Sequence, residues 1–166
     1  MSLKNVGNDM DNLTSQQRHK NMQNIRGRDT KPEVILRKKL WHLGYRYYKN
    51  FKQLPGSPDI YISKYRICVF IDSEYFHGKD WDCTDAGYPS KKYKTLREQV
   101  EHGTHPEFWT KKIEKNINHD NDVDGRLKAD GYIVIRLWSK DILHDMDSCI
   151  NTIEEAILDS KAFNNG

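Results

Sequence analysis

The sequence predicts an α/β fold, a three-layer sandwich with a mixed central sheet. Three observations predict this class. Apolar residues recur at helical spacing in several segments, and short β-prone runs bounded by turn residues lie between them. The order along the chain is helix, strands, helix, strand, helix. The length of 166 residues suits one domain with a sizeable core, which we expect over residues 14–166.

The N-terminal part is polar at first and then becomes helical. Residues 1–13 are dominated by polar side chains, so we expect a disordered tail. Residues 14–25 predict a short helix capped by Thr14, with Met22 and Ile25 on one face.

A better-marked helix follows. The segment Thr30–Glu33 fits a capping box with proline in the first turn. Leu36, Leu40 and Leu43 follow at helical spacing, and Gly44 is a natural stop.

Three strands are expected around one loop. Residues 45–48 predict the first strand, and the prolines and glycine of residues 54–58 predict the loop. Residues 60–62 alternate apolar and polar side chains, as in a half-buried strand. Residues 67–71 form a continuous β-prone run, which is typical of a central strand.

The second half begins with an irregular segment. Residues 78–104 contain glycines and a proline, so we expect no regular element there. This segment carries a basic patch of Lys91, Lys92, Lys94 and Arg97. A long helix then starts near Pro106 and ends at Gly131. Residues 132–138 predict another buried strand, and a final helix follows Ser148.

The composition excludes a membrane protein and argues against export. No stretch approaches the roughly 18 apolar residues that a membrane span needs, and the N-terminus lacks the apolar core of a signal peptide. Cys68, Cys83 and Cys149 are an odd set without close pairing, which fits reduced thiols. We therefore expect a cytoplasmic protein.

A net charge of only +3 hides a lopsided distribution. From Arg18 to Lys52, eleven Lys and Arg residues stand against two acids, whereas from Asp141 onward six acids stand against Lys161. The first region is a candidate for binding phosphates. The alternative is an ordinary solvated basic face.

Asp59 and Ile71 are candidate ligands of a divalent metal ion. Two short strands joined at Ser63 and Lys64 would bring Asp59 back beside Ile71 at one end of the sheet. A carboxylate, a backbone carbonyl, phosphate oxygens and waters are the hard ligands that Mg²⁺ selects. Such an ion would polarise a scissile phosphate. The alternative for so short a motif is a carboxylate that caps a loop.

Three further side chains could complete a hydrolytic centre. His77 lies beyond the strand end and could take a proton from an attacking water. Asp120, in the long helix, could orient that imidazole. Glu33 could hold a water on the metal, or it could only satisfy backbone donors at its helix start. Taken singly, each of the three could also be an ordinary surface or capping residue.

Aromatic residues flank this candidate centre. Tyr75 and Phe76 directly precede His77, and Trp109 lies at the start of the long helix. Exposed aromatic side chains beside a phosphodiester-cutting centre could wedge between base pairs. The alternative is packing in the core.

Five blocks of this sequence resemble the Vsr family of very short patch repair endonucleases, from about Arg18 to Trp138. Each is similar to a family motif: residues 19–22 to SKNM, 28–33 to RDT-x-x-E, 54–59 to LPG-x-PD, 69–77 to VFVDGCFWH, and 107–116 to EFW-x-x-KI-x-x-N. Asp120 follows at the family's spacing. Five ordered blocks are a far more specific signal than any one of them.

The resemblance implies a restriction-endonuclease-like fold and a Mg²⁺-dependent DNA repair nuclease, with Mn²⁺ as a substitute ion. It implies a nick in one strand of duplex DNA, 5′ to the thymine of a T·G mismatch. By resemblance, the metal ligands are Asp59 and the Ile71 carbonyl, the general base is His77, its partner is Asp120, and the contact to metal-bound water is Glu33.

The resemblance also assigns the contacts with DNA. Tyr75, Phe76 and Trp109 would form a wedge in the major groove, and Met22 and Ile25 would enter from the minor groove. The remaining DNA-binding candidates are Lys20, Arg26, Arg28 and Asn116. The expected partners are double-stranded DNA and mismatch-repair proteins, for a monomer associated with the nucleoid.

The chain departs from the family at its cysteines. Zinc-binding cysteines of the family motifs GCFWHGC and WEC are replaced around Glu74, Lys79 and Ser139, so we expect no structural zinc. Asp72 and Glu74 instead add acids beside the expected metal, and they are candidates for holding a second ion.

Two alternatives to a mismatch endonuclease stay open. One is a restriction or homing-type endonuclease on the same scaffold, which cuts without a mismatch. The other is a DNA-binding module that has lost catalysis. A binding module needs none of Asp59, His77 and Asp120, so the presence of all three argues against it.

Overall fold

The computed structural model describes residues 14–24, 27–82 and 88–165. The chain divides after Thr30 into two units, which are described separately. The tail expected over residues 1–13 lies outside the described residues. The first unit contains α1 (Ser15–Asn24). Thr14 Oγ1 accepts a hydrogen bond from the amide of Gln17, and the Gln17 side chain accepts one from the amide of Thr14. This reciprocal pair is a capping box, and it confirms the predicted helix start.

The second unit contains a mixed four-stranded sheet in the order β1-β2-β3-β4. Its strands are β1 (Tyr48–Lys49), β2 (Ile60–Ile62), β3 (Ile67–Asp72) and β4 (Ile133–Trp138). The pairs β1–β2 and β2–β3 are antiparallel, whereas β3 and β4 run parallel. The α/β class and the mixed sheet are therefore confirmed.

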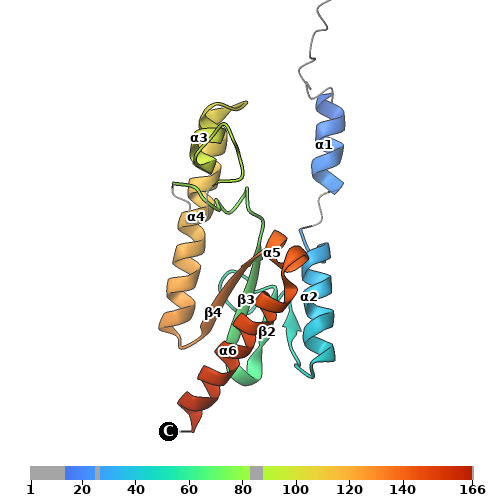
Figure 1. Cartoon of the computed structure of the whole chain (residues 1–166), viewed down its shortest axis with the longest axis vertical. Coiled ribbons are helices and arrows are strands. Elements are labelled where there is room, and N and C mark those ends of the chain that lie inside the picture. The colour runs from blue at the N-terminus through green and yellow to red at the C-terminus, as the bar shows by residue number, and fades with distance from the viewer. Residues whose placement is uncertain (1–13, 25–26, 83–87, 166) are drawn as a thin grey trace, which may run out of the picture. The chain divides into compact units, whose positions relative to one another are not determined.

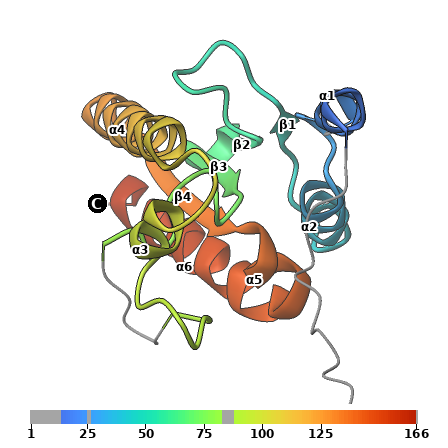
Figure 2. The same ribbon diagram turned by 90° about the horizontal axis from the view of Figure 1, so that it is seen from above.

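Helices pack on both faces of this sheet (Figures 1 and 2). One face is covered by α2 (Lys31–His42), α5 (Ser139–His144) and α6 (Met146–Asn164), and the other by α4 (Pro106–Ala129). Alternate residues of β3 supply the two cores. Val69 packs in the core formed with α2, α5 and α6, while Phe70 packs with Val123 and Leu127 of α4. Burial of each such side chain contributes roughly 1.5–3 kcal/mol.

Most predicted boundaries hold to within a few residues. Helix α2 ends at His42, and Gly44 follows with a φ of +93°, a left-handed conformation that glycine adopts without steric cost. The expected strand over residues 45–48 is only the two-residue β1, and Leu43 is exposed rather than buried. None of the helices in the described ranges is both long and apolar enough to cross a lipid bilayer.

The expectation of irregular structure over residues 78–104 is wrong in part, because α3 (Leu96–Glu101) lies within it. Thr95 Oγ1 accepts a hydrogen bond from the amide of Glu98, and Glu98 Oε2 accepts one from the amide of Lys94. The sequence Thr-x-x-Glu is a capping-box signal. A second helix that sequence reasoning missed is α5, which begins directly after β4 with no intervening turn residues.

The segment around α3 has its own small core. Trp81, Leu96 and Val100 pack against Ile113 of α4. Arg97 bonds to the carboxylate of Asp82 and, at 2.9 Å, to that of Glu114 on α4. Arg97 therefore ties α3 to α4, and its charge is already compensated.

Candidate active site

The predicted site residues gather at one end of the sheet. Strand β2 runs antiparallel to β3, so the residue that precedes β2 lies near the residues that end β3. A single helical turn, Ser63–Tyr65, joins the two strands. As a result, Asp59 Oδ2 accepts a hydrogen bond of 2.7 Å from the amide of Ile71. The structure thus brings Asp59 and Ile71 together as expected from the sequence.

The Asp59 carboxyl group has an unusual electrostatic environment. Burial raises its pKa from 3.8 to about 6, although the hydrogen bond from Ile71 opposes that rise. The negative charges of Glu33 and Asp72 raise the pKa of Asp59 further. Glu33 is itself only 4% exposed, and its Oε2 lies 3.7 Å from Arg37 Nη1. At Asp59 the negative charges of Glu33 and Asp72 therefore outweigh the positive charge of Arg136, which lowers the pKa.

His77 and Asp120 meet across the gap between β3 and α4. His77 Nδ1 lies 2.7 Å from Asp120 Oδ2. An ionised carboxylate can only accept a hydrogen bond, so a hydrogen on Nδ1 fits this contact, and in the neutral imidazole Nε2 then has the lone pair. Asp120 is in place because residues at helical spacing before and after it, Ile113, Val123 and Leu127, bury the same face of α4.

The turn that carries His77 packs directly on α4. Gly78 has a φ of +69°, and a Cβ atom there would lie 2.5 Å from Ile117 Cδ1. Asn116 Nδ2 donates a hydrogen bond of 2.8 Å to the Phe76 carbonyl. Asn116, a candidate for DNA binding, therefore holds the turn in this DNA-free structure.

Arg136 is a member of the site that sequence reasoning missed. Its Nη1 lies 3.0 Å from Asp72 Oδ2 and 3.5 Å from Asp120 Oδ1, and its Nη2 lies 2.8 Å from Asp124 Oδ1. Arg136 lies within the apolar run of residues 132–138, which predicts a strand. An arginine in a buried strand was the available signal, because such a residue is almost never buried without partners.

Asp72 and Glu74 also have partners in this structure. Asp72 is 5% exposed, and its Oδ1 lies 3.7 Å from His77 Nδ1. Glu74 Oε1 accepts a hydrogen bond of 2.7 Å from the amide of Lys140, at the start of α5. Ligand atoms of Asp72, His77 and Asp120 lie within 4.8 Å of one another, so this group could hold a metal ion.

An aromatic cluster lies beside His77. The ring centroids of Tyr75 and Trp109 are 5.5 Å apart, and those of Phe76 and Trp109 are 6.0 Å apart. All three rings are partly exposed, while Tyr75 and Trp109 also pack against the small core around Trp81. Phe108, 58% exposed, extends the cluster along α4. The rings are thus anchored on one side and accessible on the other.

The remaining DNA-binding candidates lie in the first unit. Lys20 and Arg28 are exposed. Ile25, Arg26 and the side chain of Met22 lie outside the described residues, so their predicted roles stay predictions.

Comparison with known proteins identifies the family. Residues 10–83 match the family model described as DNA mismatch endonuclease Vsr. The chain is 40% identical over 152 residues to the type II nicking enzyme V.NmeDIP of Neisseria meningitidis serogroup C, covering 92% of this chain and 93% of that protein. It is 39% identical over 149 residues to the type II nicking enzyme V.HpaIIP of Haemophilus parainfluenzae, covering 89% and 96%.

A third relative carries the family's own name. The chain is 31% identical over 121 residues to the DNA mismatch endonuclease Vsr of Escherichia coli strain K12, covering 73% of this chain and 68% of that protein. The residues gathered at the sheet end, the matching family model and these relatives agree with one another. The chain therefore belongs to the Vsr family, and it is a DNA endonuclease.

Proposed function

We propose that this protein nicks one strand of duplex DNA 5′ to the thymine of a T·G mismatch, in a Mg²⁺-dependent reaction of DNA repair. The observation that carries the proposal is the 2.7 Å contact between His77 and Asp120, at the same sheet end as Asp59. The names of the relatives support it, since one is a mismatch endonuclease and two are nicking enzymes. The scaffold proposed for it is the three-layer, restriction-endonuclease-like fold.

The proposed metal ligands are Asp59 and the carbonyl of Ile71, for Mg²⁺ or Mn²⁺. When bound, the ion would polarise the scissile phosphate and stabilise the leaving oxygen. The donor chemistry fits, because Asp59 is an oxygen ligand among excess negative charge. In the described part of the chain, Asp59 Oδ1 has no hydrogen-bond partner, so it is available to a cation. Glu33 is proposed to orient a water beside it.

His77 is the proposed general base. Its Nε2 would accept a proton from a water molecule while the water oxygen bonds to phosphorus and the bond from phosphorus to the leaving sugar oxygen breaks. Asp120 keeps the imidazole oriented through Nδ1 and stabilises the positive charge that the ring gains.

A second ion held by Asp72 and Glu74 stays a prediction. In the structure both carboxylates already have other partners. That ion would have to displace Arg136 from Asp72 and the amide of Lys140 from Glu74. The ligand pair at Asp59 and Ile71 requires no such displacement of a cation.

The proposed wedge consists of Tyr75, Phe76 and Trp109. Partly exposed rings that are anchored on one side suit insertion between base pairs, because insertion requires a rigid apolar edge. The further contacts proposed with DNA are those of Lys20, Met22, Ile25, Arg26, Arg28 and Asn116. The proposed setting is a nucleoid-associated monomer in the cytoplasm that hands its nicked product to mismatch-repair proteins.

The test is a nicking assay on a labelled duplex with a single T·G pair, in Mg²⁺. The wild-type protein should cut the thymine strand at one position. Asp59→Ala, His77→Ala and Asp120→Ala should each lose about 100-fold or more in single-turnover rate, since general base catalysis alone contributes about 10²–10⁴-fold. Asp122→Ala is the matched control, because Asp122 lies two residues further along α4 and is exposed.

Two outcomes would contradict the proposal. Equal cutting of a perfectly paired duplex would favour a restriction or homing-type endonuclease. Binding without cutting, in both Mg²⁺ and Mn²⁺ and in varied flanking sequence, would favour a DNA-binding module.

A further inference from the structure

Arg136 occupies an unusual place for a charged residue. It lies on β4, directly opposite Phe70 of β3 in the sheet. Its guanidinium group stacks over the Phe70 ring, 4.3 Å from the ring centroid, and reaches the sheet end where the site lies. The Arg136 side chain is 21% exposed, and removing a charge from water is costly unless it is paired, so the partners of Arg136 matter for the whole site.

The guanidinium group of Arg136 joins three carboxylates. Asp72, at the end of β3, contacts Nη1 through both oxygens at 3.0 and 3.2 Å. Asp124, on α4, accepts from Nε at 2.9 Å and lies 2.8 Å from Nη2. Asp120 lies 3.5 Å from Nη1 and one helical turn before Asp124. Arg136 thus connects β3, β4 and α4 at one point.

Two of these carboxylates compete for the same hydrogen of His77. Nδ1 lies 2.7 Å from Asp120 Oδ2 and 3.7 Å from Asp72 Oδ1. Nδ1 has one hydrogen to donate, so it can make one strong hydrogen bond. Asp120 makes the short contact, while both oxygens of Asp72 lie within hydrogen-bond distance of Arg136 Nη1, at 3.2 and 3.0 Å.

We propose that Arg136 is a positioning residue of the catalytic centre, which holds Asp72 and Asp124 so that Asp120 alone orients His77. This inference rests on the roles proposed above for His77 and Asp120. Arg136 acts through those side chains and needs no contact of its own with DNA or metal.

Loss of Arg136 has a specific structural consequence. Asp72 would be a buried carboxylate without its cation, and His77 Nδ1 is a donor only 3.7 Å from Asp72 Oδ1. The imidazole would turn toward Asp72, and Nε2 would leave the position that Asp120 sets. A displacement of about 1 Å in a catalytic group can cost about 100-fold in rate.

The experiment compares Arg136→Met with the double variant Arg136→Met/Asp72→Asn. Methionine keeps the apolar contact with Phe70 but removes the charge. We expect Arg136→Met to lose about 100-fold in single-turnover nicking with less than threefold change in the Kd for DNA. The double variant should recover at least tenfold, because asparagine no longer competes as a charged acceptor. Arg126→Met is the matched control, since Arg126 lies exposed on α4.

A second readout does not depend on cutting. Nitrogen-15 spectra of histidine-labelled protein report which ring nitrogen of His77 carries the hydrogen, with the signal assigned by its loss in His77→Gln. We expect the Nδ1–H form in the wild-type protein, a changed signal in Arg136→Met, and a restored signal in the double variant.

These two readouts separate the possible failures. If no duplex is cut, the proposed function fails while the spectra still test Arg136. If Arg136→Met leaves the His77 signals unchanged, or if Asp72→Asn restores neither the signals nor the rate, the positioning role is wrong. A loss of rate that only follows a loss of folded protein, measured by thermal unfolding, would also overturn it.

Discussion

Asp59 is the residue at which the stability of the folded protein and the proposed activity conflict most directly. Its side chain is largely buried beside the charges of Glu33 and Asp72, and this environment raises its pKa to about 6. The folded protein therefore favours the neutral form of a group that would have to be ionised to act as the proposed metal ligand. Proteins commonly accept such a cost at a functional site.

The free energy of unfolding of the metal-free protein should depend on pH because of this raised pKa. Well below pH 3.8 the Asp59 carboxyl is protonated in both folded and unfolded chains and has no effect on stability. As the pH rises from 3.8 to about 6, the unfolded chain releases this proton first, so stability falls. Asp59→Asn should therefore be more stable than wild type by about 3 kcal/mol above pH 7, and this difference should shrink toward zero as the pH falls below 3.8. Urea unfolding in EDTA across this range measures the difference.

Two comparisons test the cause. Asp122→Asn, at an exposed position on α4, should show no such pH-dependent difference. Added Mg²⁺ should stabilise the wild-type protein but not Asp59→Asn, because only a folded site with its carboxylate binds the ion. A stability difference for Asp59→Asn that stays constant with pH would mean that burial does not perturb this carboxyl.

At the residue scale, the sequence predicted contacts between residues close in the chain better than contacts between residues far apart in the chain. Asp59 directly precedes β2, Ile71 lies in β3, and a short turn joins the two strands, so their meeting follows from strand pairing alone. Arg136 is separated from Asp72 by 64 residues, and its contact depends on a parallel pairing that no local pattern specifies. Resemblance to a family could place His77 with Asp120, but it gave no role to Arg136.

At the scale of elements, α4 determines the position of the turn that carries His77. Its buried face carries Asp120 together with core residues, and Asn116 holds the Phe76 carbonyl. The turn approaches so closely that Gly78 leaves no room for a side chain. A substitution that disturbs the packing of the turn on α4 should therefore also displace His77.

Two glycine substitutions separate these effects. Gly78→Ala should destabilise the protein by roughly 1–3 kcal/mol, because a Cβ atom would clash with Ile117 and φ is +69°. It should also reduce nicking, since His77 is the adjacent residue. Gly125→Ala, inside α4 with no heavy atom within 4 Å of the added Cβ, should stabilise by about 1 kcal/mol.

Urea unfolding and single-turnover nicking on the same samples check both variants. Nicking by Gly125→Ala should equal that of the wild-type protein. If Gly78→Ala folds with full stability and cuts normally, then the turn has more freedom than its packing on Ile117 indicates.

The helices that sequence reasoning missed are short, and they are stabilised mainly by tertiary contacts. Helix α3 has a capping box at Thr95, but its six residues are stabilised chiefly by packing of Leu96 and Val100 beside Trp81. Helix α5 follows β4 without turn residues, and Glu74 satisfies an amide at its start from 66 residues away. Long periodic segments such as α4 could be predicted because their own sequence repeats the burial pattern.

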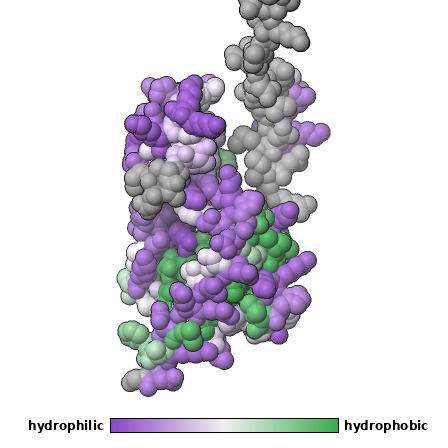
Figure 3. All heavy atoms as spheres, in the orientation of Figure 1, coloured by the Kyte–Doolittle hydropathy of each residue, from purple (hydrophilic) through white to green (hydrophobic). Residues whose placement is uncertain are grey.

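At the scale of the whole second unit, surface chemistry differs between the two ends. In the view of Figure 3, the end that carries α3 is mostly hydrophilic, whereas hydrophobic side chains reach the surface around α5 and α6. Leu143, Leu158 and Phe163 of those helices are exposed. The α3 end is thus the more polar of the two in this view.

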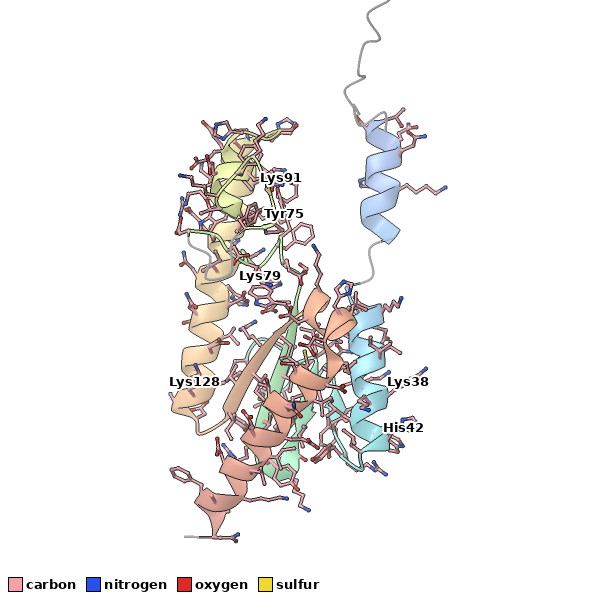
Figure 4. All side chains as sticks on the ribbon, viewed as in Figure 1. Lys38, His42, Tyr75, Lys79, Lys91 and Lys128 are labelled. Atoms are coloured by element: carbon pink, nitrogen blue, oxygen red, sulfur yellow. The ribbon has the colours of Figure 1, made fainter. Side chains whose placement is uncertain are left out.

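Lysines of the α3 end lie near the proposed wedge. Figure 4 shows Lys91 and Tyr75 at this end, and Lys38 and Lys128 toward the opposite end. Lys91, Lys92 and Lys94 are exposed, and Ser90 Oγ accepts hydrogen bonds from the amides of Lys92 and Tyr93, which fixes the loop. Arg97, by contrast, is already paired with acids.

We therefore expect the lysines at the α3 end to contact DNA phosphates. Replacing Lys91, Lys92 and Lys94 with glutamine should weaken binding at low salt. The slope of log K against log salt concentration should become shallower by up to about 3, since each phosphate contact contributes about 0.9. Fluorescence anisotropy with a labelled duplex between 50 and 300 mM KCl is the measurement, with roughly six salt steps to define the slope.

The matched control replaces Lys38, Lys39 and Lys128 with glutamine, which removes the same charge from exposed positions on α2 and at the far end of α4. A general effect of net charge would lower the slope equally in both triple variants, because long-range attraction depends on total charge. Local phosphate contacts would change the slope only in the variant at the α3 end. Equal slopes in all three proteins would mean that the duplex does not reach α3, and that the basic segment around Lys20 and Arg28 carries the phosphate contacts instead.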